Sequence, residues 1–221
     1  MMEFLQTMLE VIKRTAPGFL EATVLTLQVT AVALVLGTLL GLVFALMKIS
    51  KSKILQTIAN IYITIIRGTP LIVQIMFLYF GITAVIILDA FWAGAIALGI
   101  HNGAYIAEIF RGAIQSIDKG QREASMALGM TRGQSMKRII FPQALKRSIP
   151  PLGNQFIITL KDSSLVYIIS VSELFAVANR DAAQSYQPFE TYLVVGLYYL
   201  VLVMIFTAIL RWYEGRLNVD K

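Results

Sequence analysis

Three long stretches of this sequence, 22–47, 68–88 and 191–210, contain no charged residue. A helix that crosses a bilayer needs about 20 predominantly apolar residues, so each stretch is long enough to span. The composition agrees, because 57% of residues are hydrophobic and 14% are charged, whereas a soluble domain has roughly 25% charged residues. The sequence therefore predicts an all-α integral membrane protein and argues against an ordinary soluble enzyme or a disordered chain.

Residue types that are scarce or missing exclude several kinds of site. The chain has no Cys and one His, which excludes disulfide scaffolds, thiolate metal sites and multi-His metal sites. No G-x-x-x-x-G-K-[ST] pattern occurs, so we do not expect a phosphate-binding loop for ATP. We expect no metal and no cofactor in this chain. Energy for any uphill step must come from an ion gradient or from a partner.

The hydrophobic pattern predicts about five spans, at 20–47, 54–85, 91–110, 150–175 and 191–210. The second should bend near Gly68-Thr69-Pro70, because Pro removes a helix hydrogen bond. Lys161-Asp162 interrupts the fourth. Small residues recur every fourth position along two of the spans, which predicts close backbone packing there. They are Ala33, Gly37, Gly41 and Ala45 in the first span, and Gly99, Gly103 and Ala107 in the third.

The basic residues orient the chain. Most Lys and Arg lie at 48–53, in the loop 111–147 and after 210. Since basic loops stay on the cytoplasmic side, the N-terminus is expected outside and the C-terminus inside. We attribute the net charge of +6 to basic loops beside the membrane, and we expect no nucleic acid partner. Residues 1–18 have a helical apolar stripe that predicts an interfacial helix, with a slightly ordered tail as the alternative; 216–221 form a short tail.

The cytoplasmic loop 111–147 has its own helical pattern. Residues 121–128 are good helix formers apart from one Ser, and Gly129 is a natural helix stop. Residues 131–134 fit a capping box that starts a second helix, which we expect to end at Pro142. The result is a compact helix-turn-helix with a small Ala-rich surface, which suits docking by another protein.

Specific motifs then point to a family. The pattern Glu123-Ala124-Ser125, Gly129 and Ile139-x-x-Pro142 resembles the EAA loop of membrane subunits of ABC importers, with Ser125 where Ala is usual. Further segments resemble the polar amino acid uptake permeases, of the histidine, arginine and glutamine type. They are 66–74, 103–112, 142–145, 150–155 and 161–165. Together the matches cover about residues 20–215, so the resemblance extends over the transmembrane domain predicted at 19–215.

This resemblance implies the permease of a type I ABC importer in the bacterial cytoplasmic membrane. Two permeases pair, as two copies or as homologues, and an extracytoplasmic substrate-binding protein delivers the amino acid. ATP and magnesium bind to partner ATPase subunits, so this chain is not itself an enzyme. The EAA helix lies in a groove of the ATPase, unless 111–147 is merely a stable amphipathic loop. The residues implied in this coupling are Glu123, Ala124, Ser125, Leu128, Gly129 and Met130.

Two polar stripes inside the predicted spans are candidates for a substrate path. His101, Tyr105 and Glu108 share one helix face, and Gln155, Thr159 and Asp162 have the same spacing. Intramembrane acids are functional candidates, although Glu108 could instead pair with Arg111 or Lys161, and Asp162 with Lys161 or with a helix end. For His101 a packing role is favoured. The path candidates are Asn102, Tyr105, Glu108, Gln155, Thr159, Asp162, Ser163 and Ser164.

The segment Lys161-Asp162-Ser163-Ser164 reads as a helix break at membrane depth, where irregular backbone occurs only if it is buried or lines a cavity. Ser163 or Ser164 would cap the second half-helix, and its free amides would suit a substrate carboxylate. The neighbouring acids favour a cationic side chain, such as that of arginine, histidine or lysine.

Two other functions fit parts of the sequence. An ion-gradient-driven secondary amino acid transporter would use Glu108 and Asp162 as a proton or sodium relay. A membrane adaptor without transport activity would only anchor partners. The EAA-like loop favours the ATP-driven importer, because a gradient-driven carrier has no use for an ATPase docking helix.

Overall fold

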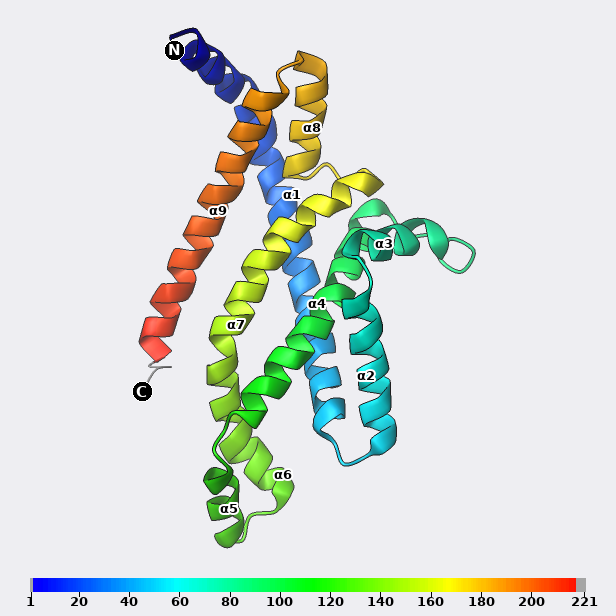
Figure 1. Ribbon diagram of the computed structural model, residues 1–221, viewed down its shortest axis with the longest axis vertical. Helices are drawn as coiled ribbons and strands as arrows, with labels where there is room; N and C mark the ends of the chain where they lie inside the picture. Colours follow the sequence, from blue (N-terminus) through cyan, green and yellow to red (C-terminus); the bar gives the residue numbers. More distant parts are fainter. Residues whose placement is uncertain (1, 218–221) are drawn as a thin grey trace.

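The structure is a computed structural model that describes residues 2–217, with side chains for residues 4–216, and this part of the chain is all-helical (Figure 1). Its elements are α1 (Met2–Ile49), α2 (Lys53–Gly68), α3 (Leu71–Met76), the π-helical turn η1 (Phe77–Gly81), α4 (Ala90–Gln115), α5 (Lys119–Ala127), α6 (Arg132–Ser135), the π-helical turn η2 (Met136–Ile140), α7 (Phe141–Asp162), the 3-10 segment η3 (Ser163–Ile169), α8 (Leu174–Ser185) and α9 (Pro188–Leu217). The predicted all-α class is confirmed.

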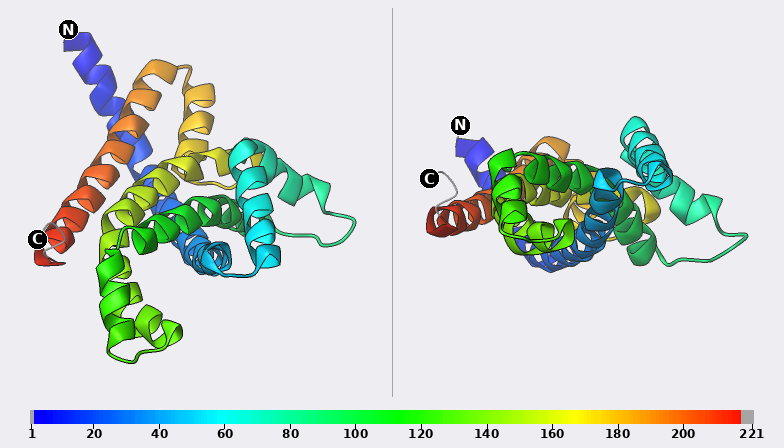
Figure 2. Two further views of the ribbon diagram at one scale, coloured as in Figure 1. Left: turned by 60° about the horizontal axis from the view of Figure 1, so that its bottom comes forward. Right: turned by 90° about the horizontal axis from the view of Figure 1, so that it is seen from below.

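The long helices give the molecule two distinct ends (Figure 1). The N-terminus of α1, helix α8 and the start of α9 gather at one end, and α5 and α6 form the opposite end. Figure 2 shows the α5–α6 hairpin projecting from the helices that carry it, and α2 and α3 standing at one side. We call the end with α8 the N-terminal end and the other the hairpin end.

The two small-residue ridges pack against each other, because α4 makes its most extensive contacts with α1. A Cβ built on Gly41 would lie 2.5 Å from Ile106 Cγ2, and one on Gly99 would lie 3.3 Å from the backbone oxygen of Ala33. Side chains at these positions would push the helices apart. The close packing expected from the ridges is thus confirmed, because the glycines of each helix make room for side chains of the other, such as Ile106 and Leu36.

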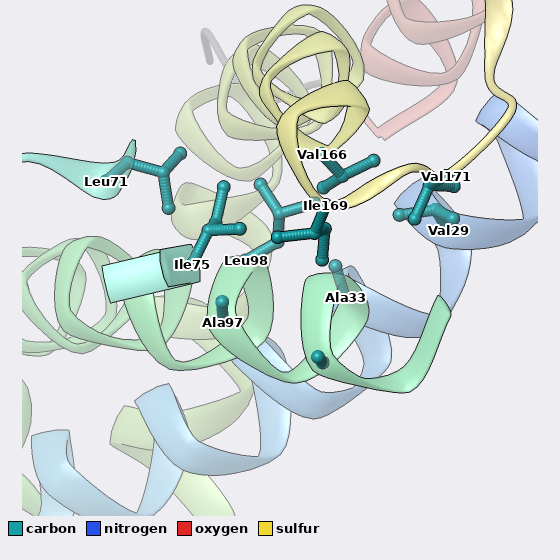
Figure 3. Packing of buried hydrophobic residues seen from close by; sticks show 10 residues of the cluster. Val29, Ala33, Leu71, Ile75, Ala97, Leu98, Val166, Ile169 and Val171 are labelled. Atoms are coloured by element: carbon teal, nitrogen blue, oxygen red, sulfur yellow. The ribbon is translucent and has the colours of Figure 1, made fainter. Parts of the chain in front are cut away.

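The main apolar cluster lies where α3 and η3 meet the α1–α4 pair (Figure 3). Val29 and Ala33 come from α1, and Ala97 and Leu98 from α4. The remaining labelled members are Leu71, Ile75, Val166, Ile169 and Val171. Because α3 and η3 are both short and irregularly flanked, burial in this cluster fixes their position.

The bend predicted near Pro70 is confirmed, and it is sharp. The axes of Lys53–Gly68 and Leu71–Gly81 differ by 106°. Pro70 precedes the first turn of α3 with φ −62°, the value that its ring imposes, and with an extended ψ of 137°. A bend of this size means that 54–85 is not one straight span: it is either a broken span or a re-entrant loop.

Two helices of the described part are long and apolar enough by themselves to cross a membrane, Phe4–Ile49 and Pro188–Arg216, and the bent α2–α3 pair counts as a third if it is one span. Helix α4 covers the predicted third span, and α7 overlaps the first half of the predicted fourth. Neither of them is among the helices that are apolar enough to count as a span alone, and many residues of α4 are buried inside the bundle. The total of five spans and their orientation therefore stay predictions.

Several predicted boundaries are wrong. Residues 2–18 do not form a separate helix, since α1 runs without interruption from Met2 to Ile49 with Pro17 inside it. Pro142 does not end the second loop helix, because it falls in the first turn of α7, where its missing N–H costs least. The preceding turn η2 is π-helical, with the Phe141 amide bonded to the Met136 oxygen. Of the predicted tail, 218–221 lie outside the described residues.

The predicted fourth span, 150–175, also differs. Helix α7 begins earlier, at Phe141, and ends at Asp162. The chain then forms the 3-10 segment η3, reverses at Ser170 with φ 66°, and enters α8. Pro150 and Pro151 lie inside α7 and do not mark its entry.

Candidate functional site

The turn of the α5–α6 hairpin is defined by helix caps and by one glycine conformation. Asp118 caps α5 by accepting the Gly120 amide at 2.7 Å. Gly129 has φ +82°, a conformation that side-chain-bearing residues rarely adopt. Thr131 then accepts from the Gln134 amide at 3.3 Å, while Gln134 Oε1 accepts from the Thr131 amide at 2.8 Å. The predicted helix stop and capping box are both confirmed.

Ser125 has a structural role that the sequence did not reveal. It is buried, its hydroxyl donates to the Arg122 oxygen at 2.8 Å, and its Oγ lies 2.5 Å from Ser135 Oγ. Ser135 is also fully buried. The residue that departs from the usual Ala therefore holds α5 against α6 through a hydroxyl pair. Nothing in the local pattern marked Ser135 as its partner.

The outward face of α5 is exposed. Glu123, Ala124 and Gly129 are exposed, and Leu128 is 82% exposed. Met130 is half-buried, and Met126, which the sequence did not single out, is 42% exposed. We call Glu123, Ala124, Met126, Ala127 and Leu128 the hairpin face. Such exposed apolar side chains beside one acid suit burial against another protein.

Glu108 is already paired. Its carboxylate forms an ion pair with Lys48 at the end of α1 and with Arg111 on its own helix, where Oε2 lies 2.7 Å from Nη2 and 2.8 Å from Nε. The alternative of an internal pair with Arg111 is confirmed, while Lys161 is not a partner. Lys48 was missed, because it lies 60 positions away. Two cations neutralise this acid.

The second polar stripe meets Asn102, which flanks the first stripe, and makes no hydrogen bond or ion pair with His101, Tyr105 or Glu108. Asn102 Oδ1 accepts from Gln155 Nε2 at 2.6 Å and from Thr159 Oγ1 at 2.8 Å. Asn102 Nδ2 donates to the Leu98 oxygen. All three side chains are buried. They form an interhelical hydrogen-bond clamp between α4 and α7, of the kind that holds membrane helices together.

Gln74 joins the α2–α3 break to α4. Its Nε2 donates to the oxygens of Ile66 at 2.8 Å and Thr69 at 3.2 Å, and its Oε1 lies 3.1 Å from His101 Nδ1. Since Nε2 donates, Oε1 must accept, so the assigned amide orientation places a hydrogen on His101 Nδ1. His101 is thus the hydrogen-bonded packing residue that was favoured.

Two neighbouring side chains form a cation–π contact near this break. The guanidinium of Arg67 lies 5.1 Å from the centroid of the Tyr105 ring, a distance at which the cation is attracted to the ring face. Tyr105 also packs 5.1 Å from the ring of His101. The polar stripe on α4 therefore reaches the α2–α3 break.

The segment around Ser163 is not a helix start. The hydroxyls of Ser163 and Ser164 donate to the oxygens of Leu160 and Lys161, at 2.8 and 2.7 Å, and the backbone continues into η3. The predicted cap at Ser163 or Ser164 is wrong, because a 3-10 turn satisfies the end of α7. Asp162 is half-buried and makes no hydrogen bond or ion pair within the described residues.

The helix actually restarts at Glu173, which the sequence analysis missed. This acid is fully buried and accepts from the amides of Phe175 at 2.9 Å and Ala176 at 2.7 Å. The hydroxyl of Tyr199 on α9 donates to it at 2.9 Å. A lone acid in the apolar run 165–178 was the available signal. Its role is to cap α8 and join it to α9.

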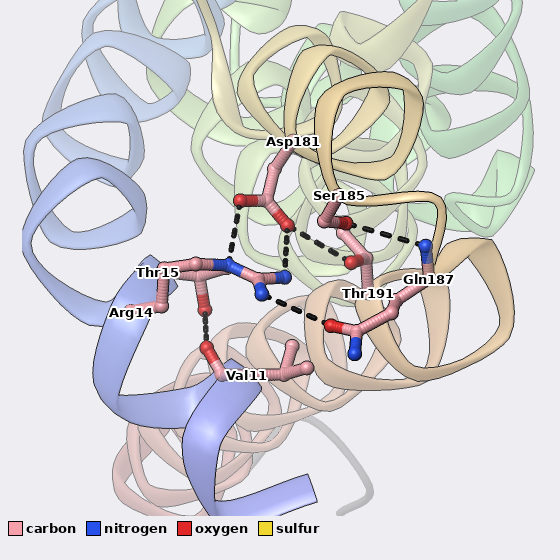
Figure 4. A network of polar contacts seen from close by, with 7 residues as sticks. All are labelled: Val11, Arg14, Thr15, Asp181, Ser185, Gln187 and Thr191. Carbon is pink, nitrogen blue, oxygen red and sulfur yellow. Dashed lines mark hydrogen bonds and ion pairs between the residues drawn. The ribbon is translucent and has the colours of Figure 1, made fainter. Parts of the chain in front are cut away.

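A polar network fixes the N-terminal end (Figure 4). Arg14 donates to both oxygens of Asp181, at 3.1 and 2.9 Å, and to Gln187 at 3.0 Å. Thr191 donates to the same Asp181 at 2.9 Å. Helices α1, α8 and α9 are therefore locked to one another at this end.

Known proteins resemble the chain over nearly its whole length. The family described as "Binding-protein-dependent transport system inner membrane component" matches residues 37–219. The arginine transport system permease protein ArtQ of Bacillus subtilis is 38% identical over 204 residues, which are 91% of this chain and 93% of ArtQ. The glutamine transport system permease protein GlnP of Escherichia coli K12 is 38% identical over 206 residues, which are 92% of this chain and 94% of GlnP.

Solved structures share the fold. A chain of an amino acid ABC transporter crystallised with histidines superposes with a TM-score of 0.88 at 41% identity, covering 94% of this chain and 97% of that one. An inward-facing structure of the MetNI methionine ABC transporter gives a TM-score of 0.73 at 18% identity, over 92% of this chain and 95% of that one. The second likeness concerns the fold alone.

Proposed function

The chain belongs to the family of inner membrane components of binding-protein-dependent transport systems, as an amino acid ABC transporter permease subunit, and from this premise we propose how it performs transport. It carries polar amino acids across the bacterial cytoplasmic membrane by alternating access. The family implies an ATPase and a substrate-binding protein as partners. Hydrolysis takes place on the ATPase, and this subunit pairs with a second permease copy or a homologue.

The observation that carries this proposal is the exposed hairpin face. Leu128 is 82% exposed at the tip of a turn that Gly129 and a capping box define. The hairpin is held to itself by Ser125 and Ser135 and stands at the end of α7 (Figure 2). A rigid hairpin joined directly to a long helix transmits a push from the ATPase into the bundle.

The proposed membrane arrangement has five spans, with the N-terminal end outside and the hairpin end in the cytoplasm. Basic residues near the hairpin end support it, since Lys48, Lys51 and Lys53 and those of the loop 111–147 lie there. Helices α4 and α7 span within the bundle, where α1 and each other shield their polar residues from lipid.

Asp162 is the acid that we assign to the substrate path. Glu108 is neutralised by Lys48 and Arg111, and Asn102, Gln155 and Thr159 satisfy one another. Asp162 is left half-buried beside Lys161. A carboxylate there favours a cationic side chain, as of arginine, although one relative of this chain is named for glutamine. We therefore propose polar and preferably basic amino acids as substrates.

The gradient-driven alternative gains no support from the geometry. A relay needs acids that can take up and release an ion, and Glu108 is held by two cations. The hairpin face would also have no role in such a carrier. An adaptor without transport activity would leave the half-buried Asp162 unexplained.

A coupling experiment tests the proposal. Glu123→Lys reverses the charge of the hairpin face, and Gly129→Val strains a backbone with φ +82°. In the lipid-reconstituted complex with its ATPase, each should abolish amino-acid-stimulated ATP hydrolysis and uptake. Glu10→Lys, the same change at the exposed N-terminal end, is the matched control and should be silent. Normal coupling in both hairpin variants would refute docking through this face.

A further inference from the structure

A hollow of about 610 Å³ lies between α1 and α8 at the N-terminal end of the molecule. Its walls are partly apolar, with Val24 and Leu25 from α1 and Val177 from α8. Its volume falls within the range of roughly 300–1,000 Å³ that is usual for small-ligand sites. It is far from the hairpin face and shares no lining residue with the proposed substrate path.

Helices α1 and α8 are tied to each other at more than one place near the hollow. A Cβ built on Gly18 would lie 3.5 Å from Val177 Cγ1, and the Leu174 amide donates to Thr26 Oγ1 at 3.0 Å. The Leu174–Thr26 hydrogen bond ties α8 to α1 beside the hollow. The Arg14–Asp181 network adds a second tie closer to the start of α1 (Figure 4).

Opposite charges line this hollow without meeting. Glu21 projects from α1 and Arg180 from α8, and both line the hollow. Both are exposed, and neither makes a hydrogen bond or an ion pair with any residue that the structure describes. The polar side chains of Gln28 and Ser172 complete the lining.

In a neighbouring hollow, the opposite charges are paired with each other. It measures about 310 Å³ and shares Gly18, Val177 and Arg180 with the first. Its own charges, Arg14 and Asp181, are paired directly at 2.9 Å. The same helices therefore bring one opposite pair into contact and keep the other apart, with a ligand-sized space beside it.

We propose that this hollow binds a zwitterion, with its anionic group on the Arg180 guanidinium and its ammonium group on the Glu21 carboxylate. A zwitterion satisfies both charges while α1 and α8 keep their positions. Arg presents a donor fork that matches a carboxylate or a phosphate. Two sources supply this chemistry: a free amino acid at the outer surface, and the headgroup of phosphatidylethanolamine.

Equilibrium binding to the purified permease–ATPase complex tests the site. The probes are radiolabelled L-arginine and glycerophosphoethanolamine, the soluble headgroup of the lipid. Glu21→Gln and Arg180→Gln should each weaken binding of the preferred probe at least tenfold. Glu10→Gln and Lys13→Gln, exposed on the same end of α1, are the matched controls and should bind as wild type does. Repeating the titration in Asp162→Asn separates this site from the substrate path.

The two probes identify the source, and the variants decide whether the site exists. Tighter binding of L-arginine indicates an outer amino acid site, and tighter binding of glycerophosphoethanolamine indicates a lipid site. Binding needs neither ATP nor uptake, so a failure of the coupling experiment leaves this result intact. The inference is overturned if wild type binds neither probe, or if both variants bind like wild type.

If Glu21 and Arg180 instead attract each other directly, we expect a different result. Each single variant would then lower the Tm without any ligand, and the exchange of Glu21→Arg with Arg180→Glu would restore it. That outcome, without loss of probe binding in the single variants, would also overturn the zwitterion site.

Discussion

The hydroxyl oxygens of Ser125 and Ser135 lie 2.5 Å apart inside the α5–α6 hairpin, where both side chains are buried. Ser125 also donates to the Arg122 oxygen at 2.8 Å, so Ser135 must be the donor within the pair. This hydroxyl pair therefore ties α5 to α6 from inside the hairpin, beside the Gln143–Gln121 hydrogen bond between α7 and α5, and it can be removed from either side.

Removing the pair should loosen the hairpin without altering its exposed face. Ser135→Ala and Ser125→Ala each remove a buried hydrogen bond, which contributes about 1 kcal/mol. The double variant should cost less than the sum of the two, because the same contact is lost. Thermal unfolding of the complex and ATP hydrolysis measure the effect. Ala183→Ser, exposed on α8 away from the hairpin, should change neither, and strictly additive losses would contradict the pairing.

Glu108 should matter for stability more than for selectivity. Glu108→Gln leaves Lys48 and Arg111 without their counter-charge, and breaking a fully buried pair costs about 3–5 kcal/mol. The loss should be smaller here, because the Glu108 side chain is 19% exposed. We expect a lower Tm and an equal fall in uptake of arginine and glutamine. A selective loss of arginine uptake at unchanged Tm would place Glu108 in the substrate path instead.

Asp162 should show the opposite pattern. It makes no hydrogen bond or ion pair within the described residues, so Asp162→Asn should leave the Tm close to that of wild type. Arginine uptake should fall at least about tenfold, equivalent to about 1.4 kcal/mol, and glutamine uptake should fall less. The affinity of the external binding protein, measured separately, is the control. Unchanged arginine uptake would remove Asp162 from the path.

Replacements of Gln74 that cannot donate a hydrogen bond should destabilise the α2–α3 bend. Its Nε2 donates to the carbonyl oxygens of Ile66 and Thr69, so Gln74→Glu sets a carboxylate against two acceptors. It should destabilise the α2–α3 bend more than Gln74→Leu does, because the leucine adds no repulsion. Thermal unfolding of both variants tests this order. Wild-type stability of Gln74→Glu would mean that the amide is not needed at the bend.

The orientation has a direct test, because the chain contains no Cys. Gly133→Cys lies on the exposed hairpin and Gln184→Cys on the exposed surface of α8. An impermeant thiol reagent should label the first only from the cytoplasmic side and the second only from outside. Labelling of both from the same side would refute the proposed arrangement of spans.

Local patterns in the sequence were enough for the features that depend on neighbours within one helical turn. The uncharged runs predicted helices, the Gly129 stop has the positive φ that glycine permits, and the Thr131–Gln134 box closes on itself. The bend at Pro70 follows from the ring of one residue. The resemblance of residues 123–142 to an EAA loop and the family also followed from local sequence order.

Such local patterns could not predict contacts between residues that lie far apart in the sequence. Lys48 meets Glu108 across 60 positions, and Asn102 meets Gln155 across 53. These contacts place Glu108 in an ion pair, and Asn102 and Gln155 in an interhelical clamp.

The tertiary structure also decided where the fourth span breaks. Burial of η3 against α1, α3 and α4 lets a 3-10 turn continue past Ser163, and Glu173 caps the restart at α8 because Tyr199 from α9 supports its carboxylate. Sequence spacing alone sets which residues share a helix face. Packing sets which faces meet, and therefore which polar side chains find no partner among the described residues: Asp162 in the bundle, and Glu21 and Arg180 between α1 and α8.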